Sequence, residues 1–300
     1  MDFTKENQFT PDQQAEIDAG IKNGIDVSVY AKPEFLAIQM HEIRVGLMEQ
    51  IPVSYYADSR YDWFQMEEIR KGLEMSLDVS KYADPEIPFD KMRQIRKALK
   101  TGIDLSDKKN LDAGVLKQLR KATREHIDLS AYINKGFDAD QLRQLRLAKK
   151  NGVDIDRYIN ADFRGISIRE IRLGLEHHVD VSVYAGREYT WQQMREIRRG
   201  MEERLDVGQY KNVLYSWQQM REIRYGLEEG MDVSYYCSFM YTAKIMRERR
   251  LELLEKTKMP VDAGEVVKKR FAYFDMLLSQ NGMEALVVLL CPGKPVAQEE

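Results

Sequence analysis

The residues best suited to chemistry in this sequence are arginines that recur at a nearly constant interval. The interval is the same at every step but one, from Arg96 to Arg120, which is shorter by two positions. A guanidinium stays charged at neutral pH and offers a planar fork of donors that fits a phosphate or a carboxylate. Such a row could follow a phosphate backbone. It comprises Arg44, Arg70, Arg96, Arg120, Arg146, Arg172, Arg198 and Arg224, and Arg250 continues it.

The helical wheel favours a structural role for this arginine ladder. At about 100° per residue, Arg198 falls beside the apolar arc that Met194 and Ile197 define, and not on the opposite, solvent-facing side. An arginine in that place can lay its stem on the core and turn its fork to a carboxylate. We expect the aspartate that recurs in each repeat, such as Asp206, to supply that carboxylate.

A second row of cations is expected to face solvent in the middle of the chain. Residues 89–160 carry 17 basic and 10 acidic residues, whereas residues 1–88 carry 8 and 17. In outer repeats a glutamate such as Glu196 follows the outward cation and would neutralise the row. In the middle repeats glutamine takes its place, at Gln94, Gln118 and Gln144. The predicted basic face comprises Arg93, Lys97, Lys100, Lys117, Lys121, Arg124, Arg143 and Lys150.

This basic face has three open interpretations. It could bind a nucleic-acid backbone or an acidic protein surface, or it could be a solvated face without a partner. No aromatic stacking platform is visible beside it in the sequence, which weakens the case for a single-stranded nucleic acid.

Four aromatic residues in two adjacent repeats form a second candidate surface. They are Tyr189, Trp191, Tyr215 and Trp217. Their place at the start of each repeat favours packing between repeats. The alternative is an aromatic edge that binds a protein partner.

The sequence contains none of the motifs that mark common active sites. It has no glycine-rich phosphate loop, no HExxH, no paired CxxC and no GxSxG. His177 and His178 are adjacent, so a helix would point them about 100° apart, and no third metal ligand stands out. We therefore predict no enzymatic activity, no metal, no cofactor and no small-molecule ligand.

Cysteine content and hydropathy predict a cytoplasmic protein. Cys237 and Cys291 are too few for a disulfide framework, which favours a reducing compartment. The first residues are polar and acidic, without a signal-peptide core. The longest apolar run, at 283–291, is much shorter than the roughly 20 residues that span a bilayer, so we expect no membrane insertion.

The repeated unit predicts the elements that position these residues. The stretch QQMREIRRGMEERLDVGQY at 192–210 returns as QQMREIRYGLEEGMDVSYY at 218–236. A cap residue such as Thr190, followed three residues later by Gln193, forms a capping box and begins a helix of about 13 residues. The segment after that helix predicts a short second helix or 3-10 turn, capped by the aspartate, with its tyrosine in the core.

A unit of this size cannot bury its apolar stripe alone, so neighbouring units must stack. The sequence thus predicts an all-α solenoid of about ten repeats over 9–258, with an irregular step near 104–110. An N-terminal tail is predicted at 1–8, a helical C-terminal cap at 259–292 and a flexible tail at 293–300.

The units at 193–211 and 219–237 resemble α-helical repeats of the same length in uncharacterised Firmicutes proteins, often encoded near mobile elements. The resemblance covers residues 9–258 and implies no known activity. The plan is also similar to leucine-rich variant repeats, in which an α-helix alternates with a 3-10 helix. We expect a non-enzymatic scaffold that binds another macromolecule, with a protein as the favoured partner. The alternatives are a nucleic acid on the basic face, or a mobile-element or phage protein that modulates a nucleic-acid-handling complex.

Overall fold

The computed structural model describes residues 8–258, and every regular element in that range is a helix. The chain is an all-α solenoid, as the repeats predict. Most of the main helices contain 12 residues, one fewer than predicted. They are α1 (Pro11–Lys22), α2 (Ala37–Met48), α3 (Trp63–Glu74), α4 (Phe89–Leu99), α5 (Ala113–Arg124), α7 (Ala139–Lys150), α8 (Gly165–Glu176), α9 (Trp191–Glu202), α10 (Trp217–Glu228) and α11 (Ala243–Lys258).

A short helical turn follows each main helix except α11 within the described range. All but one of these turns are 3-10 helices of three residues, and the exception is the α-helical turn α6. The turns are η1 (Val27–Val29), η2 (Val53–Tyr55), η3 (Val79–Lys81), η4 (Ser106–Lys108), α6 (Ser130–Asn134), η5 (Asp156–Tyr158), η6 (Val181–Val183), η7 (Val207–Gln209) and η8 (Val233–Tyr235).

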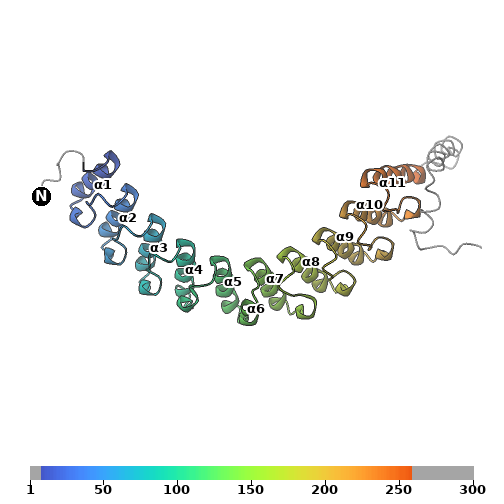
Figure 1. Cartoon of the computed structure of the whole chain (residues 1–300), viewed down its shortest axis with the longest axis horizontal. Helices are drawn as coiled ribbons and strands as arrows, with labels where there is room; N and C mark the ends of the chain where they lie inside the picture. The colour runs from blue at the N-terminus through green and yellow to red at the C-terminus, as the bar shows by residue number, and fades with distance from the viewer. Residues whose placement is uncertain (1–7, 259–300) are drawn as a thin grey trace, which may run out of the picture. The chain divides into compact units, whose positions relative to one another are not determined.

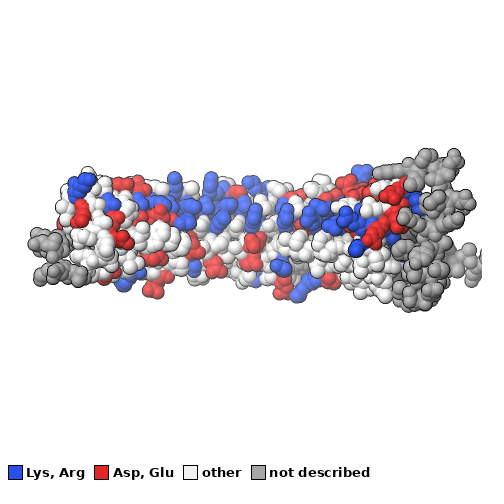
Figure 2. Space-filling view, turned by 90° about the horizontal axis from the view of Figure 1, so that it is seen from above, with Lys and Arg blue, Asp and Glu red and all other residues white. Residues whose placement is uncertain are grey.

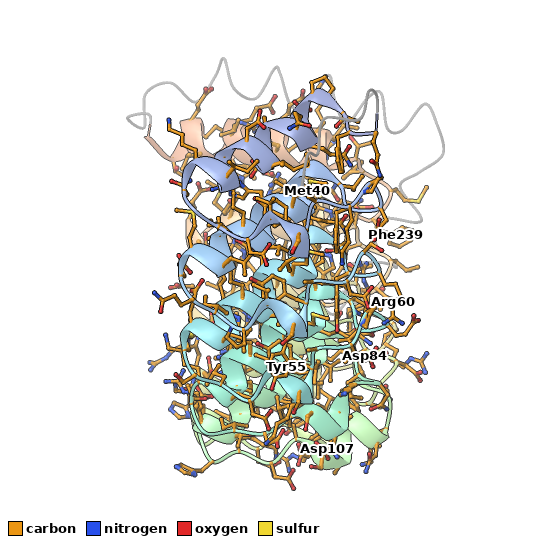
Figure 3. The ribbon with its side chains drawn as sticks, turned by 90° about the vertical axis from the view of Figure 1, so that its left-hand side faces the viewer. Met40, Tyr55, Arg60, Asp84, Asp107 and Phe239 are labelled. Atoms are coloured by element: carbon orange, nitrogen blue, oxygen red, sulfur yellow. The ribbon has the colours of Figure 1, made fainter. Side chains whose placement is uncertain are left out.

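The chain divides into two compact units, residues 1–146 and residues 147–300. In the first unit, helices α1 to α5 pack side by side in chain order (Figure 1). Their apolar residues form one continuous core, in which Met40 and Ile43 are fully buried. In Figure 3 Met40 lies among the helices, whereas Arg60 and Asp84, from two successive loops, lie along one side of the stack. In the second unit, α8 to α11 pack in the same sequential way.

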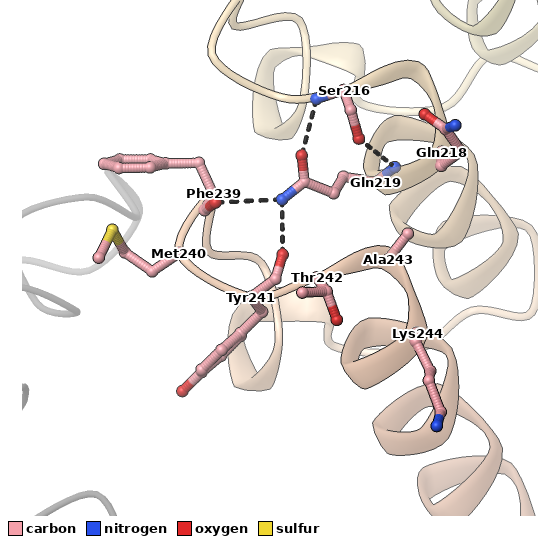
Figure 4. A pocket seen from close by; sticks show the side chains of 9 residues that line it. All are labelled: Ser216, Gln218, Gln219, Phe239, Met240, Tyr241, Thr242, Ala243 and Lys244. Carbon is pink, nitrogen blue, oxygen red and sulfur yellow. Dashed lines mark hydrogen bonds between the residues drawn. The ribbon is translucent and has the colours of Figure 1, made fainter.

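Capping boxes begin five of the main helices at the predicted residues, and they also tie each repeat to the next. Ser216 and Gln219 of α10 bond reciprocally, with Ser216 N donating to Gln219 Oε1 at 2.7 Å. The Gln219 amide then donates to the carbonyls of Phe239 and Tyr241, at 3.1 and 2.5 Å (Figure 4). Equivalent bonds into the next loop come from Gln13, Gln39, Gln65 and Gln193. The sequence predicted the cap but not this second use of the amide.

A buried tyrosine closes each outer repeat against a glycine of its own main helix. Tyr210 of the turn is fully buried, and its hydroxyl donates to the Glu196 carbonyl at 3.1 Å. A Cβ added at Gly200 would lie 1.9 Å from that hydroxyl oxygen, so only glycine leaves room for it. The same pairing recurs at Gly20–Tyr30, Gly46–Tyr56, Gly72–Tyr82, Gly174–Tyr184 and Gly226–Tyr236.

The three middle repeats replace this glycine with alanine, at Ala98, Ala122 and Ala148. The tyrosines expected in the core are accordingly half-buried at Tyr132 and Tyr158, and Lys108 stands at the third position. Larger residues fill the space where outer repeats carry valine, and all three are buried: Leu105, Leu129 and Ile155. The short turn also begins one residue later in these repeats than in the others. Alanine and the buried tyrosine therefore exclude each other.

The predicted cap at 259–292, the tail at 293–300 and almost all of the tail at 1–8 lie outside the described residues. Within the described range, no helix combines the length and the apolar content needed to cross a membrane.

We expect Gly200→Ala to lower the apparent free energy of unfolding by about 1–3 kcal/mol, because overpacking displaces the buried Tyr210 ring. Urea denaturation followed by circular dichroism measures it. In the double variant G200A/Y210F the obstructing oxygen is gone, so its cost should be smaller than the sum of the two single costs. Additive costs would show that the hydroxyl does not restrict this position.

Candidate macromolecular interface

Six arginines of the ladder pair with glutamates of the preceding main helix, and not with the recurring aspartates. The predicted aspartate partner was wrong. The Nε–Oε2 distances are 2.7 Å for Arg44–Glu16, 2.9 Å for Arg70–Glu42, 2.8 Å for Arg96–Glu68, 2.9 Å for Arg198–Glu170, 2.9 Å for Arg224–Glu196 and 3.3 Å for Arg250–Glu222. The aspartates cap the short turns instead: Asp206, for example, accepts a hydrogen bond from Gly208 N at 3.1 Å.

These glutamates, which we expected to neutralise the outward cations, are buried between helices, except for the half-buried Glu16. Glu68 and Glu170 are each only 1% exposed. A wheel with one core-facing side fails here because a helix inside a stack has a neighbour on each flank, so its buried surface extends past the apolar stripe. In these six contacts, the pair that crosses between neighbouring helices is therefore an ion pair largely removed from water.

Four arginines of the outer repeats also contact a glutamate of their own helix. Arg198 pairs with Glu202 and Arg224 with Glu228, four residues further on in each case. Burial alone would lower the pKa of the Arg198 guanidinium, but the hydrogen bonds and charges of Glu202 and Glu170 raise it above its ordinary value. Each buried cation of this kind thus has two carboxylates.

In the middle repeats Arg96 keeps its inter-helix partner Glu68, whereas Arg120 and Arg146 have no glutamate at either position. Gln94, Gln118 and Gln144 replace the inter-helix glutamate, and Lys100, Arg124 and Lys150 stand where outer repeats carry the glutamate of the same helix. These replacements could have been found in the sequence, since they recur at the same interval as the alanines of the same repeats.

Arg120 shows the consequence most clearly. Its Nε is buried without a hydrogen-bond partner, and so is Gln94 Oε1 on the neighbouring helix α4. Burial lowers the pKa of the Arg120 guanidinium, and the charge of Arg124 lowers it further. Arg146 is better placed, because its Nε lies 3.3 Å from Gln118 Oε1 and its Nη1 lies 2.6 Å from Glu125.

Six cations of the predicted basic face lie in the first unit without an ion-pair partner among residues 8–258. We call them the unpaired basic cluster: Lys97, Lys100, Lys117, Lys121, Arg124 and Arg143. All are exposed except Lys121, which is half-buried. Figure 2 shows lysine and arginine side chains close together on the face in view. Helix α5 contains no acidic residue at all.

The remaining two residues of the predicted basic face differ from the cluster. Arg93 is half-buried, and its Nε donates to Glu68 at 2.7 Å, so its charge is compensated. Lys150 is exposed but belongs to the second unit.

The cations of the cluster and the arginines beside them repel one another electrostatically. Burial lowers the pKa of Lys121, and the charges of Arg146, Lys117, Arg120 and Arg143 lower it further. The pKa of Lys97 is lowered in the same way, by burial first and then by Arg93 and Arg96. Charges on three helices therefore combine into one positive field, which an added anion would relieve.

The aromatic residues do not form an exposed edge. Tyr215 is only 3% exposed, and its hydroxyl lies 3.2 Å from Cys237 Sγ. Tyr189, Trp191 and Trp217 are half-buried, and the Tyr189 hydroxyl donates to the Lys211 carbonyl at 2.5 Å. Tyr215 therefore packs between repeats, which is the interpretation that the sequence favoured.

Two open surface pockets lie in the second unit. The pocket in Figure 4 has a volume of about 480 Å³ and is lined by the capping box of α10 and the start of α11. The other, of about 550 Å³, lies beside His178 and Glu176. Within residues 8–258, no group of three or more His, Cys, Asp or Glu side chains is arranged to hold a metal ion. The other adjacent histidine, His177, pairs with Glu202 at 2.5 Å.

Two isosteric substitutions should change stability in opposite directions. Gln94→Glu gives the unpartnered Arg120 a carboxylate, so we expect the apparent free energy of unfolding to rise by about 1–2 kcal/mol. Glu196→Gln removes a carboxylate partner from the buried Arg224, and we expect the apparent free energy of unfolding to fall by about 1–3 kcal/mol. Urea denaturation of both variants decides this. A loss of stability in Gln94→Glu would mean that desolvation of the new carboxylate outweighs its pairing.

Comparisons of this chain with protein-family models, with curated proteins and with solved structures gave no match. Its possible roles therefore have to be inferred from the charges, contacts and exposure of its own side chains.

Proposed function

We propose that this chain is a non-enzymatic repeat scaffold that binds an anionic macromolecule through the unpaired basic cluster. One observation carries the proposal: α5 and α7 keep the ladder arginine but have no glutamate at either position that supplies its carboxylates in the outer repeats, and Arg120 Nε is left without a partner. The outer repeats show that the fold accommodates those carboxylates readily. Their replacement leaves positive charge that no side chain of the cluster's own helices neutralises.

A partner explains the cluster better than solvation alone. A solvated protein surface ordinarily mixes charges of both signs. Here α5 carries Lys117, Arg120, Lys121 and Arg124 and no acid, and the pKa of Lys121 is lowered by burial and by its cationic neighbours. Such a field steers anionic partners toward the surface and is partly cancelled when they bind.

The repeat architecture suits a large partner. Packed helices lie about 8–10 Å apart, so each repeat adds one row of side chains at a regular interval. The side-by-side order of α4 and α5 places two such rows next to each other (Figure 1). A macromolecule with repeated negative charge can contact several rows at once.

A protein partner without strong charge is the second candidate, and a different surface supports it. Val213, Leu214, Tyr235 and Met240 are exposed on loops and turns of the second unit. Large apolar side chains of this kind supply much of the energy of protein interfaces. The buried thiol of Cys237 is in keeping with a reducing cytoplasm as the proposed location. If the chain associates with a nucleic-acid-handling complex, we propose that the unpaired basic cluster makes the contact.

Retention on immobilised heparin, a generic polyanion, tests the proposal. We expect the double variant K117E/K121E to elute at clearly lower salt than the unaltered protein, since surface charge attraction is screened by ions. The control variant K211E/K244E makes the same change in net charge in the second unit, and it should elute close to the unaltered protein. Equal shifts in both variants would show that retention follows net charge and would contradict the proposal. Circular dichroism checks that both variants fold.

A further inference from the structure

The unpaired basic cluster has the composition of a phosphate-binding surface and not of a protein-binding one. It consists of four lysines and two arginines. Protein interfaces are depleted in lysine and depend on apolar or aromatic anchors. None of the three helices that carry the cluster has an exposed large apolar side chain, and the nearest one along the chain is Met75, which contacts Arg96. Binding to a nucleic-acid backbone needs no apolar anchor, because it depends on charge attraction and on the release of counterions.

The spacing of the cations suits the two backbones that flank a groove of duplex DNA. On α5, Lys117, Lys121 and Arg124 are separated by four and three residues, so they share one face and span about 10 Å. Lys97 and Lys100 extend this face onto α4, about 8–10 Å away. The grooves of B-form DNA are about 6 and 12 Å wide, so phosphates on both sides of a groove come within reach of this grid.

The surroundings of the cluster disfavour single strands and A-form RNA. Single-strand binding relies on exposed aromatic rings that stack on bases. Phe89, at the start of α4, is half-buried, and the Arg93 guanidinium lies 5.3 Å from its ring centroid. Recognition of an RNA duplex draws on contacts to 2′-hydroxyls, whereas the cluster consists of cations alone.

We propose that the unpaired basic cluster binds the phosphate backbone of duplex DNA without reading its sequence. This inference rests on the proposed function and names the partner that the function requires. Arg120 lies on α5 between Lys117 and Lys121, and its uncompensated charge adds to the field. A phosphate bound over α4 and α5 would neutralise positive charge there, as the glutamates do in the outer repeats.

Fluorescence anisotropy of the full chain with a short labelled DNA duplex of mixed sequence tests this inference. With about six phosphate contacts, the association constant should fall about 10³-fold between about 50 and 200 mM salt. A second duplex of unrelated sequence should bind with nearly the same affinity. In K117E/K121E the affinity should fall at least tenfold and the salt dependence should become shallower by about two contacts. K211E/K244E should match the unaltered protein.

A further variant separates the effect of the electrostatic field from the effect of direct contacts between the exposed cations and DNA. Q94E/Q118E adds two buried carboxylates beneath the cluster and leaves every exposed cation in place. We expect weaker binding than that of the unaltered protein, in contrast to K211E/K244E, which has its charges changed far along the chain. Unchanged binding by Q94E/Q118E would overturn the part of the inference that concerns Arg120.

The competitors in the assay distinguish the remaining outcomes. Single-stranded DNA or duplex RNA that binds as tightly as duplex DNA would overturn the assignment of the partner. Binding of polyglutamate but not of DNA would also overturn it, while the proposed function would stand with an acidic protein as partner. If neither polyanion binds in a way that K117E/K121E weakens, both the inference and the proposed function fail.

Discussion

In a stack of helices, each helix has a neighbour on both flanks, and this constraint shapes the whole molecule. The buried surface of a main helix is wider than its apolar stripe, so it includes positions occupied by arginine and glutamate. A charge can be buried there only if it is paired, because desolvation of an isolated ion costs several kcal/mol. Arg198 and Glu170 satisfy this requirement across one helix–helix contact, and the same pair recurs along the outer repeats.

The other recurring contacts serve the same stacking. Gln193 begins its own helix and holds the next loop through its amide. Tyr210 fills the space above Gly200 and binds the carbonyl of Glu196, the residue whose carboxylate receives Arg224. These side chains thus make contacts within their own repeat and also support the contact with the next repeat. This double use explains why so short a unit can be repeated.

The middle repeats keep the stacking and change its electrostatics. Alanine replaces the glycine, the tyrosine leaves the core, and a larger buried residue, Leu105 or Leu129, stands at the valine position, so an apolar side chain remains buried there. Glutamine keeps the shape of glutamate but gives up its charge, which leaves Arg120 with a buried, unpartnered Nε. The sequence changes are thus consistent with one another: they preserve burial and remove neutralisation. A surface that is stable yet electrostatically unsatisfied is suited to bind an anion.

The sequence by itself determined the fold class, the length of most main helices to within about a residue, the capping boxes and the excess of positive charge in the middle. These features depend on local spacing, and ten copies of one unit reinforce each spacing. The tertiary structure alone decided which carboxylate meets which arginine. It also showed that Glu68 is buried, that Tyr215 is unavailable to a partner, and which cations lack a counter-charge. The reason is that these properties depend on the main helix of the neighbouring repeat, whose flank no single-helix wheel represents.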